Sequence, residues 1–221
     1  MKVLLFGATG MVGQGVLREC LLDPEVQLVQ TIGRSFTGLK HTKLREIVHQ
    51  DMTSYASLND QLSGFDACFF CLGVSSSGMK EDEYERITYG VTMAAAETLS
   101  RLNPRMIFIY VSGTGTDSTE HGRMMWARVK GRTENALLRL PFKSAYMFRP
   151  GFIEPVHGVR SKTPAYRLIY LLTAPFTPLL RRAFPNSILT TEQIGLAMLS
   201  VAKHGTSKHI LESKDIRATL I

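Results

Sequence analysis

Three glycines near the amino terminus, Gly7, Gly10 and Gly13, are spaced so that they can bind phosphate. Gly7 and Gly10 would let the backbone turn sharply close to a phosphate, and Gly13 would let a helix pack against the strand before it. The N–H groups that begin such a helix, with the positive end of its dipole, form an anion site suited to a pyrophosphate. We therefore predict a dinucleotide-binding turn, and the alternative is a plain tight turn. The cofactor-binding residues expected here are Gly7, Thr9, Gly10, Met11 and Val12.

Arg34 and Ser35 form a second candidate site, directly after Gly33 at the end of the next apolar run. In a dinucleotide-binding fold, an acidic residue at this place would bind the ribose 2′-hydroxyl of NAD. The chain has no acidic residue there, and a guanidinium beside a hydroxyl suits a 2′-phosphate. The sequence therefore favours NADP over NAD, and the alternative is that Arg34 is a solvated loop arginine.

Four further residues, in two pairs, suit a nucleotide. Asp51 could accept the adenine amino hydrogens while Met52 packs on the ring, although a turn or helix-capping aspartate is an equally good interpretation. Leu72 and Gly73 end another apolar run and lead into small residues, which would leave room for a ligand or form a flexible loop.

These residues all follow strands in an alternating pattern of strands and helices. Strands are predicted at 3–6, 27–32, 66–72, 106–111 and 144–149, with a possible edge strand at 208–212. An alternation of charged and apolar residues predicts another strand at 43–49. Helical patterns follow the glycine turn as far as residue 21 and cover 81–102, 121–140 and a last helix from 190. The pattern predicts an α/β fold of the Rossmann type, with a doubly wound, mostly parallel sheet. Ligands of such folds bind at the carboxyl ends of the strands.

The glycine turn, Ser112 after the fifth strand, Lys130 on the following helix and residues 149–153 resemble the short-chain dehydrogenase/reductase superfamily. The chain looks most like its atypical, NAD(P)H-binding and epimerase-like branch, which includes the Tat-interacting-protein oxidoreductase group. The resemblance spans roughly residues 2–212. It implies that Ser112 binds a substrate carbonyl and that Lys130 holds the nicotinamide ribose and lowers the pKa of a tyrosine four residues earlier. It also implies a set of residues at the nicotinamide end, namely Pro150, Gly151, Phe152 and Ile153.

Trp126 stands where that superfamily has its catalytic tyrosine. An indole N–H does not titrate in the usable range, so Trp126 cannot be the general acid. The chain could reduce a small carbonyl substrate, or act on a hydroxyl compound, with a proton from water or from Tyr89, His121 or His157. It could instead bind the cofactor without catalysis, as a sensor or interaction scaffold, or transfer hydride where no tyrosine is needed. Trp126 could also be a core aromatic.

Length and composition indicate one domain of 221 residues. The net charge of +7 suits an anionic ligand, and no basic stripe with interleaved aromatic residues points to nucleic acid. We expect no metal site, and we interpret Cys68 and Cys71 as structural thiols. The amino terminus enters a strand directly, without a secretory signal segment, which leads us to expect a cytoplasmic protein.

The resemblance implies that residues 152–190 form a lid on the substrate side of the domain. By the resemblance, such a segment often contributes to a subunit contact, so a homo-oligomer is a candidate assembly. Residues 166–180 are nearly all apolar but interrupted by prolines, which is too short and too broken for a membrane-spanning helix. A segment of this kind with basic flanks could instead lie at a membrane surface.

Overall fold

The computed structural model describes residues 1–159 and 187–220. Within them, parallel strands form a seven-stranded sheet in the order β3-β2-β1-β4-β5-β6-β9. The strands are β1 (Lys2–Phe6), β2 (Leu28–Gly33), β3 (Leu44–Val48), β4 (Ala67–Phe70), β5 (Ile107–Val111), β6 (Ser144–Arg149) and β9 (Ile210–Glu212). The strand order reverses between β1 and β4, which confirms the predicted doubly wound Rossmann-type sheet.

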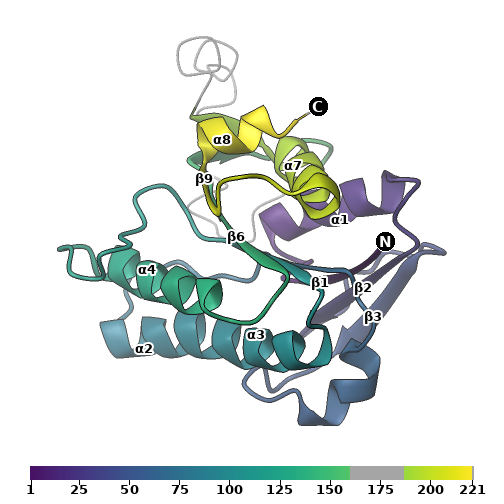
Figure 1. The fold of residues 1–221 in the computed structure, drawn as a ribbon, viewed down its shortest axis with the longest axis horizontal. Coiled ribbons are helices and arrows are strands. Elements are labelled where there is room, and N and C mark those ends of the chain that lie inside the picture. The colour runs from purple at the N-terminus through teal and green to yellow at the C-terminus, as the bar shows by residue number, and fades with distance from the viewer. Residues whose placement is uncertain (160–186, 221) are drawn as a thin grey trace.

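Helices cover both faces of this sheet (Figure 1). One face carries α1 (Met11–Leu22) and α7 (Thr191–His204), and the opposite face carries α3 (Val91–Leu102) and α4 (Met125–Leu138). Three shorter helical pieces are α2 (Glu81–Glu85), η1 (Ala56–Leu62) and α8 (Ser213–Ala218). Since both faces are covered, the central strands β4 and β5 are continuous apolar runs, whereas the edge strand β3 alternates charged and apolar residues.

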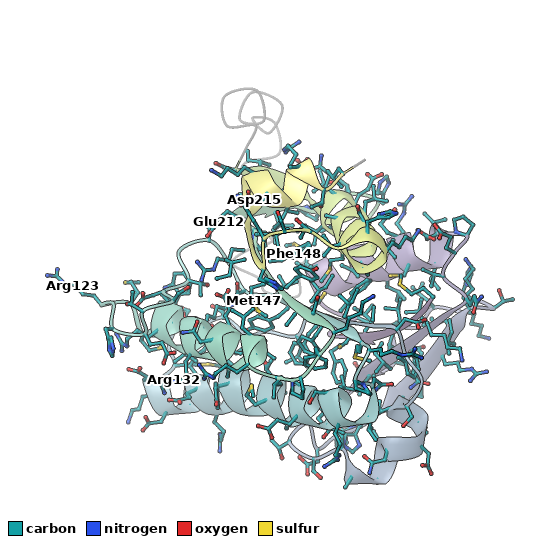
Figure 2. The ribbon with its side chains drawn as sticks, in the orientation of Figure 1. Arg123, Arg132, Met147, Phe148, Glu212 and Asp215 are labelled. Carbon is teal, nitrogen blue, oxygen red and sulfur yellow. The ribbon has the colours of Figure 1, made fainter. Side chains whose placement is uncertain are left out.

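The core lies in two layers, one on each face of the sheet. Successive strand residues alternate between them, so Met147 packs with the α3 and α4 layer while Phe148 packs with the α1 and α7 layer. Figure 2 shows this pair in the middle of the molecule, and Arg123 at its periphery. Burial of Leu4 and Leu5 on opposite faces follows the same rule.

Close backbone contact holds α1 against α7. A Cβ atom added at Gly15 would lie 2.6 Å from Thr191 Cβ, and one added at Gly195 would lie 2.7 Å from Glu19 Cγ. The amino end of α7 is a capping box, in which the Thr190 hydroxyl accepts from the Gln193 N–H and the Gln193 side chain accepts from the Thr190 N–H. The predicted capping sequence is therefore confirmed, with α7 fixed against the helix that follows the glycine turn.

The long helix expected over 81–102 contains a π-helical turn, η2 (Arg86–Gly90). This turn widens the helix by one residue and rotates the face that the sequence period predicts. A regular helical period over 81–102 would place Ile87, Thr98 and Leu102 on the inward face with Tyr84 and Val91. In the structure these three residues are only partly buried, whereas Thr88 is buried. A strict helical period cannot reveal such an insertion.

The helix expected from His121 begins only at Met125. Upstream, the Asp117 carboxylate accepts hydrogen bonds from the Thr119 N–H and hydroxyl and from the Gly122 N–H. These bonds lower the pKa of Asp117, the Thr119 hydroxyl contributing most. They fix a compact loop that competes with the helix for these residues.

Three elements near the carboxyl end of the chain were not expected from the sequence. Parallel strands β7 (Phe152–Glu154) and β8 (Ile188–Thr190) form a separate small sheet, in which Phe152 pairs with Ile188. A short helix, α8, follows the edge strand β9. The prediction that the helix from residue 190 is the last one is therefore wrong. The chain between β7 and β8 includes most of the expected lid, and its residues 160–186 lie outside the described part of the structure.

Candidate functional site

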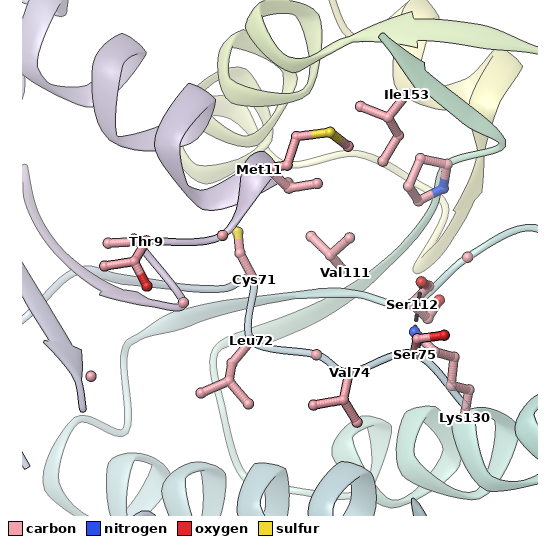
Figure 3. A pocket seen from close by; sticks show the side chains of 18 of the residues that line it. Thr9, Met11, Cys71, Leu72, Val74, Ser75, Val111, Ser112, Lys130 and Ile153 are labelled. Carbon is pink, nitrogen blue, oxygen red and sulfur yellow. Dashed lines mark hydrogen bonds between the residues drawn. The ribbon is translucent and has the colours of Figure 1, made fainter. Parts of the chain in front are cut away.

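A cavity of about 1240 Å³ opens along the carboxyl ends of β1, β2, β4, β5 and β6. Ligand pockets commonly have volumes of about 300–1000 Å³, so there is room for an extended cofactor beside a small substrate. Fourteen of the sixteen predicted cofactor-binding residues line it, together with Ser112 and Trp126. These fourteen are Gly7, Thr9, Gly10, Met11, Val12, Arg34, Ser35, Leu72, Gly73, Lys130, Pro150, Gly151, Phe152 and Ile153. Figure 3 shows part of this wall.

Side chains at the first and last glycines of the turn would collide with the backbone around them. Gly7 has φ +78°, and a Cβ atom there would lie 2.7 Å from the backbone of Cys71. A Cβ atom on Gly13 would lie 2.1 Å from the Gly7 carbonyl oxygen, which accepts a hydrogen bond from the Gly10 N–H at 2.9 Å. Gly10, at the amino end of α1, has no side chain that could cap the helix, and Met11 and Val12 in its first turn line the cavity. This end therefore presents N–H groups where an anion could bind.

Arg34 and Ser35 lie at the β2 end of the cavity and are exposed. The Arg34 carbonyl accepts a hydrogen bond from the Gln50 side chain at 3.1 Å, which positions the loop backbone. Gln50 also lines the cavity and was not predicted as a site residue. Within the described residues, no carboxylate lines the cavity, so its electrostatic character is cationic.

Asp51 and Met52 do not line the cavity. The Asp51 carboxylate accepts from the Thr53 hydroxyl and N–H, and these bonds lower its pKa. Met52 is packed in the core with only 7% of its surface exposed. Asp51 thus matches the alternative interpretation as a turn aspartate. A role of Asp51 and Met52 in adenine binding stays a prediction.

The Ser112 hydroxyl is hydrogen-bonded to a buried ionic cluster. It donates to Glu134 Oε1, and Glu134 is fully buried. Arg149 donates from Nε and a terminal nitrogen to the same carboxylate, and it also contacts Glu212 at 3.4 Å and the Ser118 hydroxyl. Burial alone would lower the pKa of Arg149, but its bonds to Glu134 raise it. This cluster was not predicted, because no local spacing in the sequence signals it.

Lys130 is partly buried where α4 passes the end of β5. Its Nζ atom donates to the Ser112 carbonyl oxygen at 2.7 Å and lies 6.0 Å from the centre of the Tyr110 ring. Figure 3 shows the side chain directed to Ser112. Desolvation lowers the pKa of Lys130 to about 8, although the charge of Glu134 opposes the shift. The lysine is thus a cation at the β5 side of the cavity, held by a neutral acceptor.

Trp126 lies one helical turn before Lys130 and also lines the cavity. Its ring packs against Gly115, where an added Cβ atom would lie 3.3 Å from Trp126 Cη2 and where φ is +88°. The indole is therefore part of the cavity wall and not a fully buried core aromatic.

The alternative proton sources named from the sequence lie elsewhere. Neither Tyr89 nor His121 lines the cavity, and His157 pairs with Glu192 at 2.9 Å near a separate cavity of about 610 Å³. Polar cavity residues that sequence reasoning did not select as site residues include Ser75, Ser76, Tyr84 and Thr114. For Ser75, Ser76 and Thr114, the only signal in the sequence was the small polar composition of the loops after β4 and β5.

The cysteines occupy the interior. Cys68 is fully buried, and burial raises the pKa of the Cys68 and Cys71 thiols, although Cys71 also lines the cavity. In residues 1–159 and 187–220, no group of three or more His, Cys, Asp or Glu side chains is arranged to hold a metal ion. None of the helices described there has the length and apolar character needed to cross a membrane. The apolar segment 166–180, with its predicted membrane-surface contact, lies outside the described residues.

Two curated relatives are similar to the chain in sequence. Protein FMP52-2, mitochondrial, of Scheffersomyces stipitis is 26% identical over 152 residues, which cover 67% of this chain and 65% of the relative. Protein fmp52, mitochondrial, of Emericella nidulans is 27% identical over 159 residues, covering 69% and 66%. The match thus spans slightly less than two thirds of these relatives' length. No protein-family model matches the chain.

The names of these relatives point to mitochondria and contradict the expected cytoplasmic location. The expectation of a cytoplasmic location is wrong because it rested only on the lack of an apolar secretory segment. Mitochondrial targeting uses amphipathic, arginine-rich sequences, which that test does not detect.

Solved structures share the fold. A short-chain dehydrogenase/reductase family oxidoreductase from Burkholderia thailandensis has a TM-score of 0.70 at 16% identity, covering 98% of this chain and 92% of that chain. WbmF from Bordetella bronchiseptica, solved with NAD⁺, has a TM-score of 0.69 at 15% identity, covering 99% and 76%. The chain therefore has the fold of short-chain dehydrogenases/reductases.

Proposed function

We propose that this protein is an NADP-binding oxidoreductase or epimerase-like protein of the short-chain dehydrogenase/reductase type, acting on a small carbonyl or hydroxyl compound. The observation that carries the proposal is the single cavity wall formed by the glycine turn, Arg34 and Lys130. Structural neighbours with the same fold were solved with NAD⁺ or NAD bound. The narrower likeness to the Tat-interacting-protein oxidoreductases stays a prediction, since the relatives found are FMP52 proteins.

The residues present fit a nicotinamide dinucleotide. The first turn of α1 would bind the pyrophosphate through its N–H groups, and Lys130 would hydrogen-bond the nicotinamide ribose. When bound, the cofactor would supply or accept a hydride. Phe152 and Ile153 would contact the nicotinamide side and exclude water from it.

The preference for NADP over NAD rests on Arg34 and Ser35. Both are exposed at the β2 end of a cavity whose described lining contains no carboxylate. A 2′-phosphate there would gain a charge-assisted hydrogen bond, whereas no acidic side chain would bind a free 2′-hydroxyl.

A second candidate is a cofactor sensor or interaction scaffold without catalysis. Trp126 favours it, because the tyrosine of the superfamily is absent from its place. A homo-oligomer and a single-domain chain belong to the proposal as well, and most of the expected lid, residues 152–190, lies outside the described residues. No nucleic-acid partner is proposed, and the mitochondrial names of the relatives favour a mitochondrial location.

The test is calorimetric titration of the folded protein with NADPH and, separately, with NADH. We expect tighter binding of NADPH, followed by NADPH oxidation when p-nitrobenzaldehyde or phenanthrenequinone is added as a carbonyl probe. No binding of either nucleotide would overturn the proposal. Binding without oxidation would favour the sensor. A Trp126→Tyr variant that gains reductase activity would show that the missing phenol limits turnover.

A further inference from the structure

The cavity offers few groups that could give a proton to a substrate. Among the described residues that line it, the titratable side chains are Arg34, Cys71, Tyr84 and Lys130. A guanidinium does not release its proton in proteins, and burial raises the pKa of Cys71. Tyr84 exposes only 1% of its surface. The accessible group that titrates near neutral pH is therefore Lys130.

The two other positions that serve a substrate carbonyl in the superfamily are occupied differently. Trp126 carries an N–H that does not titrate. The hydrogen of the Ser112 hydroxyl is donated to Glu134, and the Ser112 oxygen lies 3.2 Å from the Phe148 carbonyl. Ser112 is thus bonded within the protein, and we assign to it the positioning of β5 against α4.

Lys130 lies where it could donate a proton in place of Trp126 and Ser112. Its one hydrogen bond within the described structure goes to the Ser112 carbonyl, so two of its three N–H bonds remain for a ligand. Glu134, one helical turn further on, is bonded to Arg149 and Ser112 and does not form an ion pair with the lysine. The ammonium group is consequently held at the cavity wall without an acidic partner.

We propose that Lys130 is itself the general acid, donating a proton from Nζ to the carbonyl oxygen of the substrate. This inference rests on the proposed oxidoreductase function. The carbonyl carbon accepts a hydride from the reduced nicotinamide, the C=O double bond becomes a single bond, and its oxygen takes the Nζ proton. The substrate is reduced, the nicotinamide is oxidised, and the neutral amine recovers its proton from water.

The surroundings of Lys130 set the pH range. Desolvation lowers its pKa to about 8, the carboxylate of Glu134 on the same helix opposes this, and the Tyr110 ring of β5 lies beneath it. Tyr84 of α2 lines the same cavity, and Arg149 of β6 neutralises Glu134. A general acid acts best when its pKa is near the working pH. Because the protonated form is the active one, the rate of reduction should fall as pH rises through about 8.

The first measurement needs no cofactor. Isotope-labelled lysine side chains are titrated by NMR at Cε in the complete protein, and the Lys130 signal is identified by its absence from a Lys130→Arg variant. We expect a midpoint near pH 8, against 10.5 for an ordinary lysine. Lys143→Arg, which replaces an exposed lysine far from the cavity, is the control for assignment. A midpoint in the ordinary range would overturn the proposal.

The second measurement is the pH profile of single-turnover NADPH oxidation with p-nitrobenzaldehyde. Lys130→Arg keeps the charge and a donor to the Ser112 carbonyl but cannot release a proton. We expect its rate to fall by about 100-fold or more and the inflection near pH 8 to disappear. An unchanged inflection in Lys130→Arg, or its loss in Tyr84→Phe instead, would overturn the assignment while leaving the oxidoreductase function intact. Failure of the wild-type protein to bind NADPH or to oxidise it would overturn both.

Discussion

Arg34 determines, in our proposal, which nicotinamide cofactor the protein prefers. It is exposed, and the described cavity lining offers no carboxylate that would bind a ribose hydroxyl in its place. Replacing Arg34 with alanine removes one charge-assisted hydrogen bond to a 2′-phosphate and should weaken NADPH binding by about 10- to 100-fold. NADH binding should change little. Calorimetry on Arg34→Ala measures both, with Arg105→Ala, an exposed arginine outside the cavity lining, as the matched control. Equal weakening of the two cofactors would contradict the role of Arg34.

Glu134 gives a second prediction at this scale. Its side chain is fully buried and that of Arg149 is 10% exposed, so loss of the carboxylate charge leaves a desolvated guanidinium. Glu134→Gln should lower the free energy of unfolding by about 2–4 kcal/mol, measured by urea denaturation. The control is Glu85→Gln, whose partner Arg132 lies on the same helix as Glu134 but is 38% exposed, and it should cost about 0–1 kcal/mol. Similar losses in both variants would show that burial does not matter here.

Glycines allow helices α1 and α7 to pack closely, and this contact stabilises the helix that follows the cofactor-binding turn. Gly15→Ala would bring a Cβ atom to 2.6 Å from Thr191 Cβ, so the two helices must move apart. We expect a loss of about 1–3 kcal/mol in the free energy of unfolding. Gly90→Ala, at a helical glycine with nothing within 4 Å of the added atom, should instead be neutral or stabilising by up to about 1 kcal/mol. Thermal unfolding of the two variants distinguishes crowding from helix propensity.

Local sequence patterns identified the strands and the glycine turn, because these depend on residues close together in the chain. β6 was predicted with its observed bounds, and Arg34, Lys130 and Trp126 line the cavity as the strand order required. The direction of the Ser112 hydroxyl could not be predicted, because Glu134 and Arg149 come from two other elements. Three-residue strands such as β7 and β8 are too short to show a period.

At the scale of the whole molecule, the net charge of +7 should affect cofactor binding through long-range attraction. NADPH carries an additional phosphate, so its affinity should fall more steeply with salt than that of NADH. Raising the sodium chloride concentration from about 50 to about 500 mM should weaken NADPH binding by about 10-fold and NADH binding by about 3-fold. Titrations at several salt concentrations test this, and parallel salt dependences would argue against a cationic site for the 2′-phosphate.

Strands β7 and β8 bring together two parts of the chain that are far apart in the sequence. Phe152 is the register partner of Ile188, and the Phe152 N–H donates to the Ser187 carbonyl oxygen at 3.1 Å. Phe152 also lines the cavity, whereas the glycine turn, Arg34 and Lys130 belong to other elements. In engineering terms, β7 and β8 are a pair of junctions. A stretch of chain grafted between them would begin beside the cofactor cavity without changing the residues proposed to bind the cofactor.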